Sequence, residues 1–451
     1  MQAPVALLVT GPTLRHVIRM TAAGTVGLIA VFAVEALGLF YIALLGRPEL
    51  TAAMGYAGTV LFFATSISIG LSIAATALTA RALGRGERQQ AKQLAGASLL
   101  LMVSAMGVLA CVAYPLLRPM LGLLGATGQT AELALSFMHI ILPSWPLLGA
   151  GMCLSGLLRA LGDARRSMFV TLGSAATSVL LDPLMIFGFG LGLTGAGISA
   201  VLTRAVMVAF GLYGLLRVHR LIAWPGLEFM RREFKPFIAI GLPAVLTQIA
   251  TPVGNAYVTG TVAAFGDDAV AAWAVIQRII PVAFGMLFAL SGAIGPIIGQ
   301  NYGAARLDRV MSTLRDSLKV TLLYATVVWA LLAASGGLLA DLFRATPTAH
   351  ELIVFFCVFV AGSFVFNGAL FVANAAFNNL GFAFYSTALN WGRSTLGVIP
   401  FVWLGQHWYG AKGAIAGYGI GVVLFGVFAC LLCFRVVARL QLRVGSARVP
   451  A

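Results

Sequence analysis

The chain has 451 residues, of which 60% are hydrophobic and only 10% are charged. A soluble domain carries about 25% charged residues, so this composition excludes a water-soluble globule and indicates a polytopic helical membrane protein. The formal net charge of +15 does not indicate a nucleic-acid partner, because the basic residues are dispersed over short segments instead of lining one groove.

Apolar segments with few charges divide the chain into twelve predicted membrane-spanning helices, since about 20 apolar residues cross a bilayer. In chain order the segments are Met20–Gly46, Leu50–Ala80, Gln93–Leu117, Leu133–Leu158, Ser167–Leu216, Pro236–Gly266, Ile279–Ala305, Val320–Ala340, Leu352–Gly392, Ser394–Ala411 and Gly413–Phe434. The segment Ser167–Leu216 is long enough for two helices, divided near residues 188–192. The segment Leu352–Gly392 contains a predicted turn at Asn378–Gly381, and the helix after this turn continues through Ser394–Ala411.

The basic residues predict an orientation. With the N-terminus in the cytoplasm, 22 of the 29 Lys and Arg residues fall on the cytoplasmic side. Four lie on the opposite side, and Arg204, Arg278 and Arg393 fall within spans. This positive-inside bias predicts that both termini are cytoplasmic.

The two halves of the chain repeat each other at a separation of 219 residues. Gly84 and Gly303 close similar segments after the second and eighth spans, and Gly162 and Gly381 follow the fourth and tenth. Six helices followed by six in the same orientation predict two pseudo-symmetric lobes around a central cleft.

Five segments follow from this organisation. They are a cytoplasmic N-terminal segment (1–19), an N-lobe of helices 1–6 (20–217), a cytoplasmic linker (218–234), a C-lobe of helices 7–12 (235–435) and a cytoplasmic tail (436–451). Two lobes facing one cleft suggest alternating access. An enzyme is the alternative outside this class, and it would need His139 within hydrogen-bonding distance of Glu35 or Asp182.

Several motifs resemble one transporter family. The segments are Arg159–Asp163, Leu181–Gly188, Gly195–Ser199, Gly241–Pro243 and Gly299–Ala304. In order and spacing they resemble multidrug and toxic compound extrusion (MATE) transporters, within the MOP flippase superfamily. The resemblance implies a twelve-helix, two-lobe exporter of organic, often cationic, compounds, driven by proton or sodium entry. A flippase for a lipid-linked or oligosaccharide substrate, which shares the fold, is the alternative.

Two acids fall within the spans, Glu35 and Asp182, and both belong to the first lobe. An acid in a bilayer is costly unless it faces an interior, so each is a candidate functional residue. A shielded carboxylate can bind and release a proton near neutrality, whereas two adjacent carboxylates could share a sodium ion. We expect both to couple ion entry to export, with a proton favoured over sodium because no dense cluster of oxygen ligands accompanies them.

The sequence departs from the family pattern at Gly38, where relatives usually have Asp. Ser155 stands where relatives often have Asn, while its repeat partner Asn374 keeps that residue. Ser178 precedes Asp182 by one helical turn and could bond its carboxylate. The residues predicted to bind substrate or to support the site are Ser178, Ser155, Asn255, Gln248, Asn374, Asn367, Arg278 and Arg393.

The intramembrane arginines have two interpretations. They either pair with backbone carbonyls at broken helices and reach toward the interface, or they attract an anionic or zwitterionic substrate. We expect no catalytic residue, no cofactor and no resident metal, apart from a sodium ion at Glu35 and Asp182 in the sodium-coupled alternative. The expected partners are small organic substrates and membrane lipids, not nucleic acid, with the protein a monomer in the bacterial inner membrane.

Overall fold

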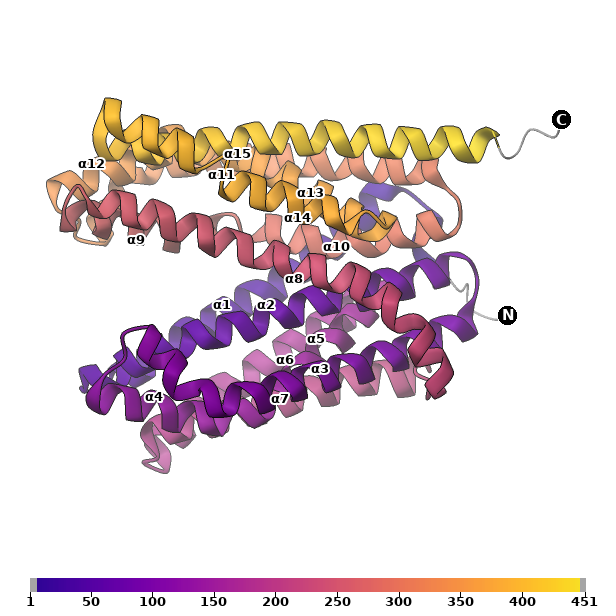
Figure 1. Ribbon diagram of the computed structural model, residues 1–451, viewed down its shortest axis with the longest axis horizontal. Coiled ribbons are helices and arrows are strands. Elements are labelled where there is room, and N and C mark those ends of the chain that lie inside the picture. Colours follow the sequence, from indigo (N-terminus) through magenta and orange to yellow (C-terminus); the bar gives the residue numbers. More distant parts are fainter. Residues whose placement is uncertain (1–5, 447–451) are drawn as a thin grey trace. The chain divides into compact units, whose positions relative to one another are not determined.

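A computed structural model describes residues 6–446 of the chain. Every regular element in that range is a helix, which confirms the predicted all-α class. The first five residues of the predicted N-terminal segment 1–19 and the last five of the predicted tail 436–451 lie outside the described residues. The long helices run side by side within each half of the chain (Figure 1).

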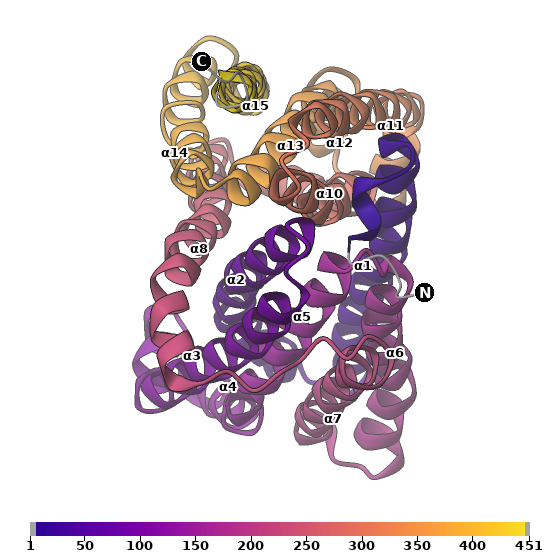
Figure 2. The same cartoon turned by 90° about the vertical axis from the view of Figure 1, so that its right-hand side faces the viewer.

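The described chain forms two compact units, and the first contains Val26–Val245. Most of its helices lie entirely within it, and Figure 2 shows α2 beside α5 in a view along their length. These helices are α2 (Pro48–Gly84), α3 (Arg88–Leu123), α4 (Gly128–Ile141), η2 (Leu142–Ser144), α5 (Trp145–Ala160), α6 (Ala164–Pro183), η3 (Leu184–Gly188), α7 (Gly192–Leu212) and η4 (Tyr213–Val218).

The second unit contains Leu7–Thr25 and the chain from Leu246 on. Its buried apolar cluster includes Trp273, Phe284 and Phe364, and the rings of the last two stack at 4.5 Å. Its helices are η1 (Leu7–Val9), α9 (Asp267–Ala283), α10 (Gly285–Gly303), α11 (Leu307–Leu342), α12 (Pro347–Phe355), η5 (Phe356–Val360), η6 (Ala361–Ser363), α13 (Phe364–Leu380), α14 (Ala383–Ser394) and α15 (Ile399–Ser446).

Two long helices are divided between the units: α1 (Thr13–Ala43) after Thr25 and α8 (Leu227–Ala263) after Val245. The predicted lobes 20–217 and 235–435 assign each helix to one lobe, whereas the compact units divide both. A side-chain contact explains why the start of α1 belongs to the second unit. Thr13 Oγ1 donates to Asp316 Oδ2 of that unit at 2.5 Å.

The start of α8 packs in the first unit for a comparable reason. The segment before it is held by a hydrogen bond from Ala223 N to Lys92 O at 3.2 Å. Further along, Gly70 of α2 admits the α8 backbone, since a Cβ at Gly70 would lie 2.5 Å from Val245 N. No side chain fits there without a shift of the backbone.

The count of twelve spans agrees with the described helices. Ten segments are long and apolar enough to cross a membrane, and the pair α9 and α10, bent by 44°, adds one. One of the ten, Ala383–Arg443, has 61 residues, about 90 Å of helix against a hydrocarbon core of about 30 Å. Gly410, with φ of 59° and ψ of −140°, breaks it into two spans at a conformation that favours glycine.

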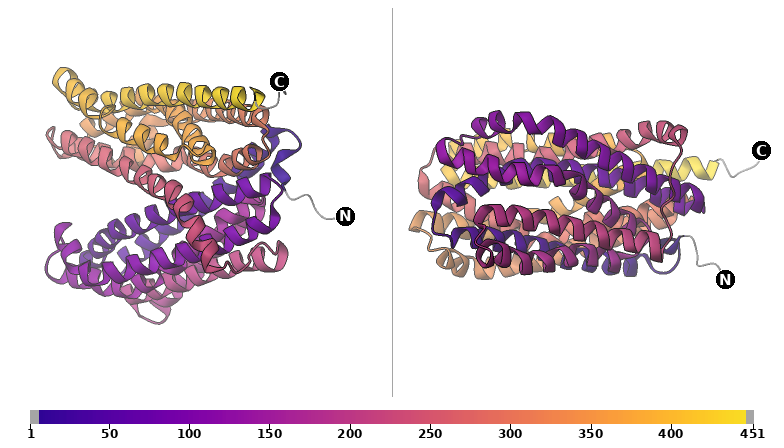
Figure 3. Two further views of the ribbon diagram at one scale, coloured as in Figure 1. Left: turned by 45° about the vertical axis from the view of Figure 1, so that its right-hand side comes forward. Right: turned by 90° about the horizontal axis from the view of Figure 1, so that it is seen from below.

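The predicted internal repeat is present in side-chain contacts as well as in the order of helices. In the first unit Ser155 Oγ and Ser167 Oγ lie 2.9 Å apart. The residues 219 positions later are Asn374 and Ser386, and Ser386 Oγ donates to Asn374 O at 3.2 Å. Figure 3 shows the helices of each unit from two further sides, again running lengthwise.

Candidate functional site

The first candidate residue, Asp182, lies near the end of α6. That helix begins with Asp163 as its N-cap, which accepts from Arg166 N at 3.0 Å, and it ends at Pro183, after which the chain continues as the π-helical turn η3. Asp182 is 7% exposed and therefore lies inside the first unit and not on its surface.

Two hydroxyl groups hold the Asp182 carboxylate. Ser178 Oγ, one turn earlier on α6, donates to Oδ2 at 2.7 Å, and Ser199 Oγ of α7 donates to Oδ1. Each carboxylate oxygen therefore has one donor. The sequence motif Gly195–Ser199 contains Ser199, but its contact with Asp182 was not predicted because it depends on how α6 and α7 pack.

Helix α1 passes beside this carboxylate at Gly38. A Cβ added there would lie 3.9 Å from Asp182 Oδ2, so the usual family Asp at this position would contact Asp182. Glu35 lies one turn earlier on α1 and is exposed. Among residues 6–446 it forms neither a hydrogen bond nor an ion pair, and no group of three or more His, Cys, Asp or Glu side chains could hold a metal ion.

Ser155 lies elsewhere in the first unit, near the C-terminal end of α5. It accepts a hydrogen bond from Arg159 Nη1 at 3.0 Å in addition to its contact with Ser167. Ser155 therefore belongs to a polar cluster around Arg159, and the structure does not bring it to Asp182.

The predicted amides of the second unit fall into two places. Asn374 Oδ1 accepts from Asn390 Nδ2 at 3.0 Å inside the helix pair α13 and α14. Asn255 of α8 donates from Nδ2 to Gln277 Oε1 of α9 at 3.3 Å, and the contribution of Gln277 was not predicted. Asn367 is buried with its Oδ1 unpaired among the described residues, and Gln248 is half-buried on α8.

The three intramembrane arginines have different surroundings. Arg204 Nη1 donates to Ser144 Oγ at 2.5 Å and to Ile141 O at 3.3 Å, where α4 breaks before α5. This contact matches the interpretation of pairing with carbonyls at a broken helix. Arg278 is exposed on α9, while Arg393 is 2% exposed at the end of α14.

His139 does not join either acid. Its ring lies 4.8 Å from that of Tyr114, centroid to centroid, and the hydrogen-bond partners of Asp182 are Ser178 and Ser199. The contact that a membrane enzyme would require is therefore not present within residues 6–446. At the α4 break, Ser144 Oγ and Arg204 Nη1 both donate to the Ile141 carbonyl.

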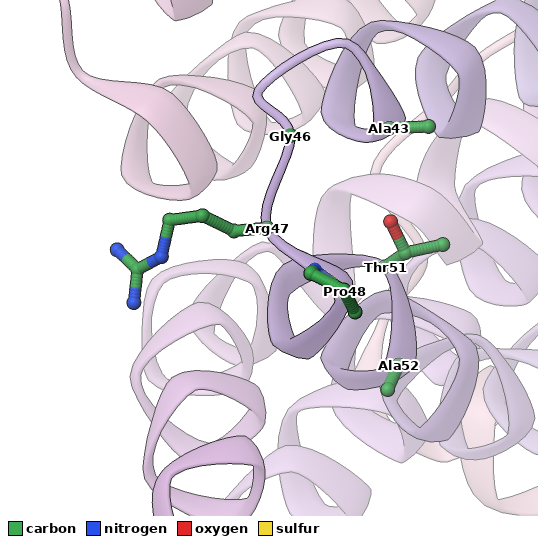
Figure 4. Close-up of a pocket in the computed structure, with 6 residues that line it drawn as sticks. All are labelled: Ala43, Gly46, Arg47, Pro48, Thr51 and Ala52. Atoms are coloured by element: carbon green, nitrogen blue, oxygen red, sulfur yellow. The ribbon is translucent and has the colours of Figure 1, made fainter.

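An open hollow of about 540 Å³ lies at the loop between α1 and α2. Figure 4 shows the six residues that line the hollow, with the Arg47 side chain extending away from Thr51 and Ala52; the other three are Ala43, Gly46 and Pro48. None of the predicted site residues lines this hollow, so it is separate from the Asp182 site.

A family model described as MatE matches residues 25–184 and 243–404 of the chain, one match in each half of the internal repeat. The chain is 28% identical over 435 residues to a protein of Shewanella oneidensis named FAD transporter, covering 95% of this chain and 96% of that protein. It is 22% identical over 410 residues to the multidrug export protein MepA of Staphylococcus aureus, covering 88% of each.

Solved structures agree in fold. The bent form of the Vibrio cholerae MATE transporter VcmN aligns with a TM-score of 0.91 at 24% identity, covering 95% of this chain and 98% of that chain. The two matched halves, the helical fold and the apolar spans lead to one conclusion: the chain belongs to the MATE family of multi-pass membrane transporters.

Proposed function

We propose that the protein is a secondary active exporter that moves organic compounds out of the cell in exchange for protons. Asp182 is the main ion-coupling residue, and Glu35 is a second one. The observation that carries this proposal is the buried Asp182 carboxylate, held by Ser178 and Ser199 beside α1. An acid inside a span is costly, and in transporters such acids mark ion and proton pathways.

The two hydroxyl partners suit a proton better than a sodium ion. A serine hydroxyl donates to an ionised carboxylate and can rotate to accept from a protonated one, so the site is satisfied in both protonation states. A sodium ion, by comparison, prefers several oxygen ligands, and Asp182 is the one carboxylate in this hydrogen-bonded group. Sodium shared between Glu35 and Asp182 remains the alternative to be tested.

The transported compound is an organic molecule, and the relatives supply two candidates. MepA is named a multidrug export protein, which supports broad export of organic compounds. The FAD transporter supports a second candidate, an anionic flavin dinucleotide, and the buried cation Arg393 favours that possibility. We further propose a monomer in the bacterial inner membrane with both termini cytoplasmic, an orientation supported by the distribution of Lys and Arg.

The test of coupling uses purified protein in liposomes, with efflux of a fluorescent dye measured under an imposed proton gradient and then under a sodium gradient. We expect the proton gradient to drive efflux. Asp182→Asn should abolish this response and Glu35→Gln should reduce it, because both substitutions remove a titratable group while keeping the shape of the side chain. Glu132→Gln is the matched control, since Glu132 is an exposed acid paired with Arg118 at 2.8 Å.

Two outcomes would contradict the proposal. Ion-driven efflux that survives both Asp182→Asn and Glu35→Gln would remove these acids from the mechanism. A response of the wild type to the sodium gradient alone would replace proton coupling by sodium coupling.

A further inference from the structure

We propose that Arg393, together with Thr251, Gln277 and Tyr418, forms an anion-binding subsite in the second unit. This subsite would take the carboxylate or phosphate group of the transported organic compound. The inference rests on the proposed export function and adds to it the chemical class of the substrate, an organic anion.

The Arg393 side chain is buried with part of its hydrogen-bonding capacity unused. It is 2% exposed, and its Nη2 donates to Thr251 Oγ1 of α8 at 2.8 Å, while Tyr418 of α15 lies beside it. Its Nε is buried without a hydrogen-bond partner, and no carboxylate within residues 6–446 forms an ion pair with it. A buried guanidinium without an anion is costly, so an anionic group that reaches it gains charge-assisted hydrogen bonds.

Further polar groups lie next to Asn255 and Arg393, on α9 and α14. Asn255 follows Thr251 by one helical turn, and its Nδ2 donates to Gln277 Oε1 at 3.3 Å. Among the described residues, Gln277 Nε2 is buried without a hydrogen-bond partner, as is Ser394 Oγ next to Arg393 in the chain. The subsite therefore has donors to spare and, in this group of side chains, no negative charge.

Gly254 explains how α14 comes so close to α8. A Cβ added at Gly254 would lie 3.1 Å from Ser394 Cβ, a distance tighter than an ordinary contact. The absence of a side chain on this turn of α8 lets the end of α14, with Arg393 and Ser394, pack next to Thr251 and Asn255.

The internal repeat relates the two helices that carry the buried acid and the buried arginine. Asp182 lies on α6, which begins at Ala164, and Arg393 lies on α14, which begins 219 residues later at Ala383. Related helices of the two units therefore carry opposite charges. A proton at Asp182 and a substrate anion at Arg393 would bind in different units and would not compete for one group.

The test measures equilibrium binding of two flavins to the purified full-length protein in detergent. Flavin adenine dinucleotide carries two phosphates, and riboflavin has the same ring system with none. Arg393→Gln should weaken dinucleotide binding by about tenfold or more, since it removes a charged partner, and should change riboflavin binding by less than about twofold. Arg393→Lys should fall between the wild type and Arg393→Gln, because it keeps the charge without the planar fork. Arg118→Gln, which removes an exposed arginine of the first unit, should bind both flavins like the wild type.

Three outcomes would overturn the inference: no dinucleotide binding by the wild type, wild-type affinity in Arg393→Gln, or equal weakening of both flavins. If Arg393→Gln does not fold, Arg393→Lys decides. It should weaken dinucleotide binding while riboflavin binding stays at the wild-type value, and equal weakening of both flavins would overturn the inference. The proposed coupling fails separately, because it requires Asp182→Asn to bind the dinucleotide and lose the response to a proton gradient.

Discussion

At the residue scale, the candidate site depends on the hydrogen-bond donors of the Asp182 carboxylate. Two serine hydroxyls, from α6 and α7, satisfy one carboxylate oxygen each. The Ser178 contact follows from the i, i+4 spacing on one helix and could be predicted from sequence. The Ser199 contact could not, because 17 residues and the η3 turn separate the partners and only the packing of α6 on α7 joins them.

Ser199 should contribute measurably to transport through this contact. A hydrogen bond to a charged group is worth about 1.5–3 kcal/mol, so Ser199→Ala should lower proton-driven efflux by about tenfold or more. Ser199→Thr keeps the hydroxyl and should retain most of the activity. The measurement is initial efflux rate in liposomes under a fixed proton gradient, and equal rates for Ser199→Ala and the wild type would contradict the assigned role.

The buried arginines show where reasoning from sequence ends. Sequence places Arg204 and Arg393 inside spans but does not distinguish them, since both follow apolar runs. Tertiary structure separates them, because Arg204 donates to the Ile141 carbonyl at a helix break. Arg393 instead donates to the Thr251 hydroxyl and lies beside Tyr418, its polar partners within the described chain.

At the element scale, short connecting segments are fixed by polar contacts at helix ends. In the second unit, Leu8 of η1 donates from N to Gln300 Oε1 at 2.9 Å and accepts from Asn301 Nδ2 at 3.1 Å. This contact gives the motif Gly299–Ala304 a structural role at the end of α10. In the first unit, His219 follows η4, and its Nε2 lies 2.7 Å from Oδ2 of Asp163, the N-cap of α6.

Asp163 lies in the loop between α5 and α6, outside the spans. Burial raises the pKa of its carboxyl, but hydrogen bonds from His219 and Arg166 outweigh burial and hold this pKa well below its usual range. A carboxyl with a lowered pKa stabilises the folded protein above its unfolded pKa of about 3.9, and this contribution is lost as the pH falls through the folded value.

Asp163→Ala should therefore destabilise the protein by roughly 2 kcal/mol at pH 7, because the helix loses its cap and the linker loses its anchor. The deficit should be equal at pH 5 and should shrink below about pH 4. Thermal unfolding in detergent at several pH values measures this, with Glu132→Gln as an exposed control. A deficit that grows on acidification would contradict the assigned charge of Asp163.

At the scale of the whole molecule, the fold was largely predictable because charge-free runs and the 219-residue repeat leave few alternatives. Twelve spans and two related halves follow from hydropathy and spacing alone. The division of α1 at Thr25 and of α8 at Val245 did not follow, since it depends on contacts such as Thr13 with Asp316, more than 300 residues apart in sequence.

The two units carry different charges inside the same repeated framework. The first holds Asp182 between two hydroxyls, and the second holds Arg393, which forms no ion pair with any carboxylate of the described chain. The sequence places these charges in order along the chain, but which groups surround each of them on α6 and α14 becomes evident only in the structure. In our account the first unit handles the coupling ion and the second the substrate.

The most direct test of the central claim, that Asp182 couples proton entry to export, is a measurement of proton movement driven by substrate alone. Liposomes containing the protein and an internal pH-sensitive dye are given a substrate gradient with no imposed pH gradient. We predict that substrate flow changes the internal pH in the wild type, and that Asp182→Asn binds substrate without moving protons. Equal proton movement in Asp182→Asn and the wild type would contradict the account.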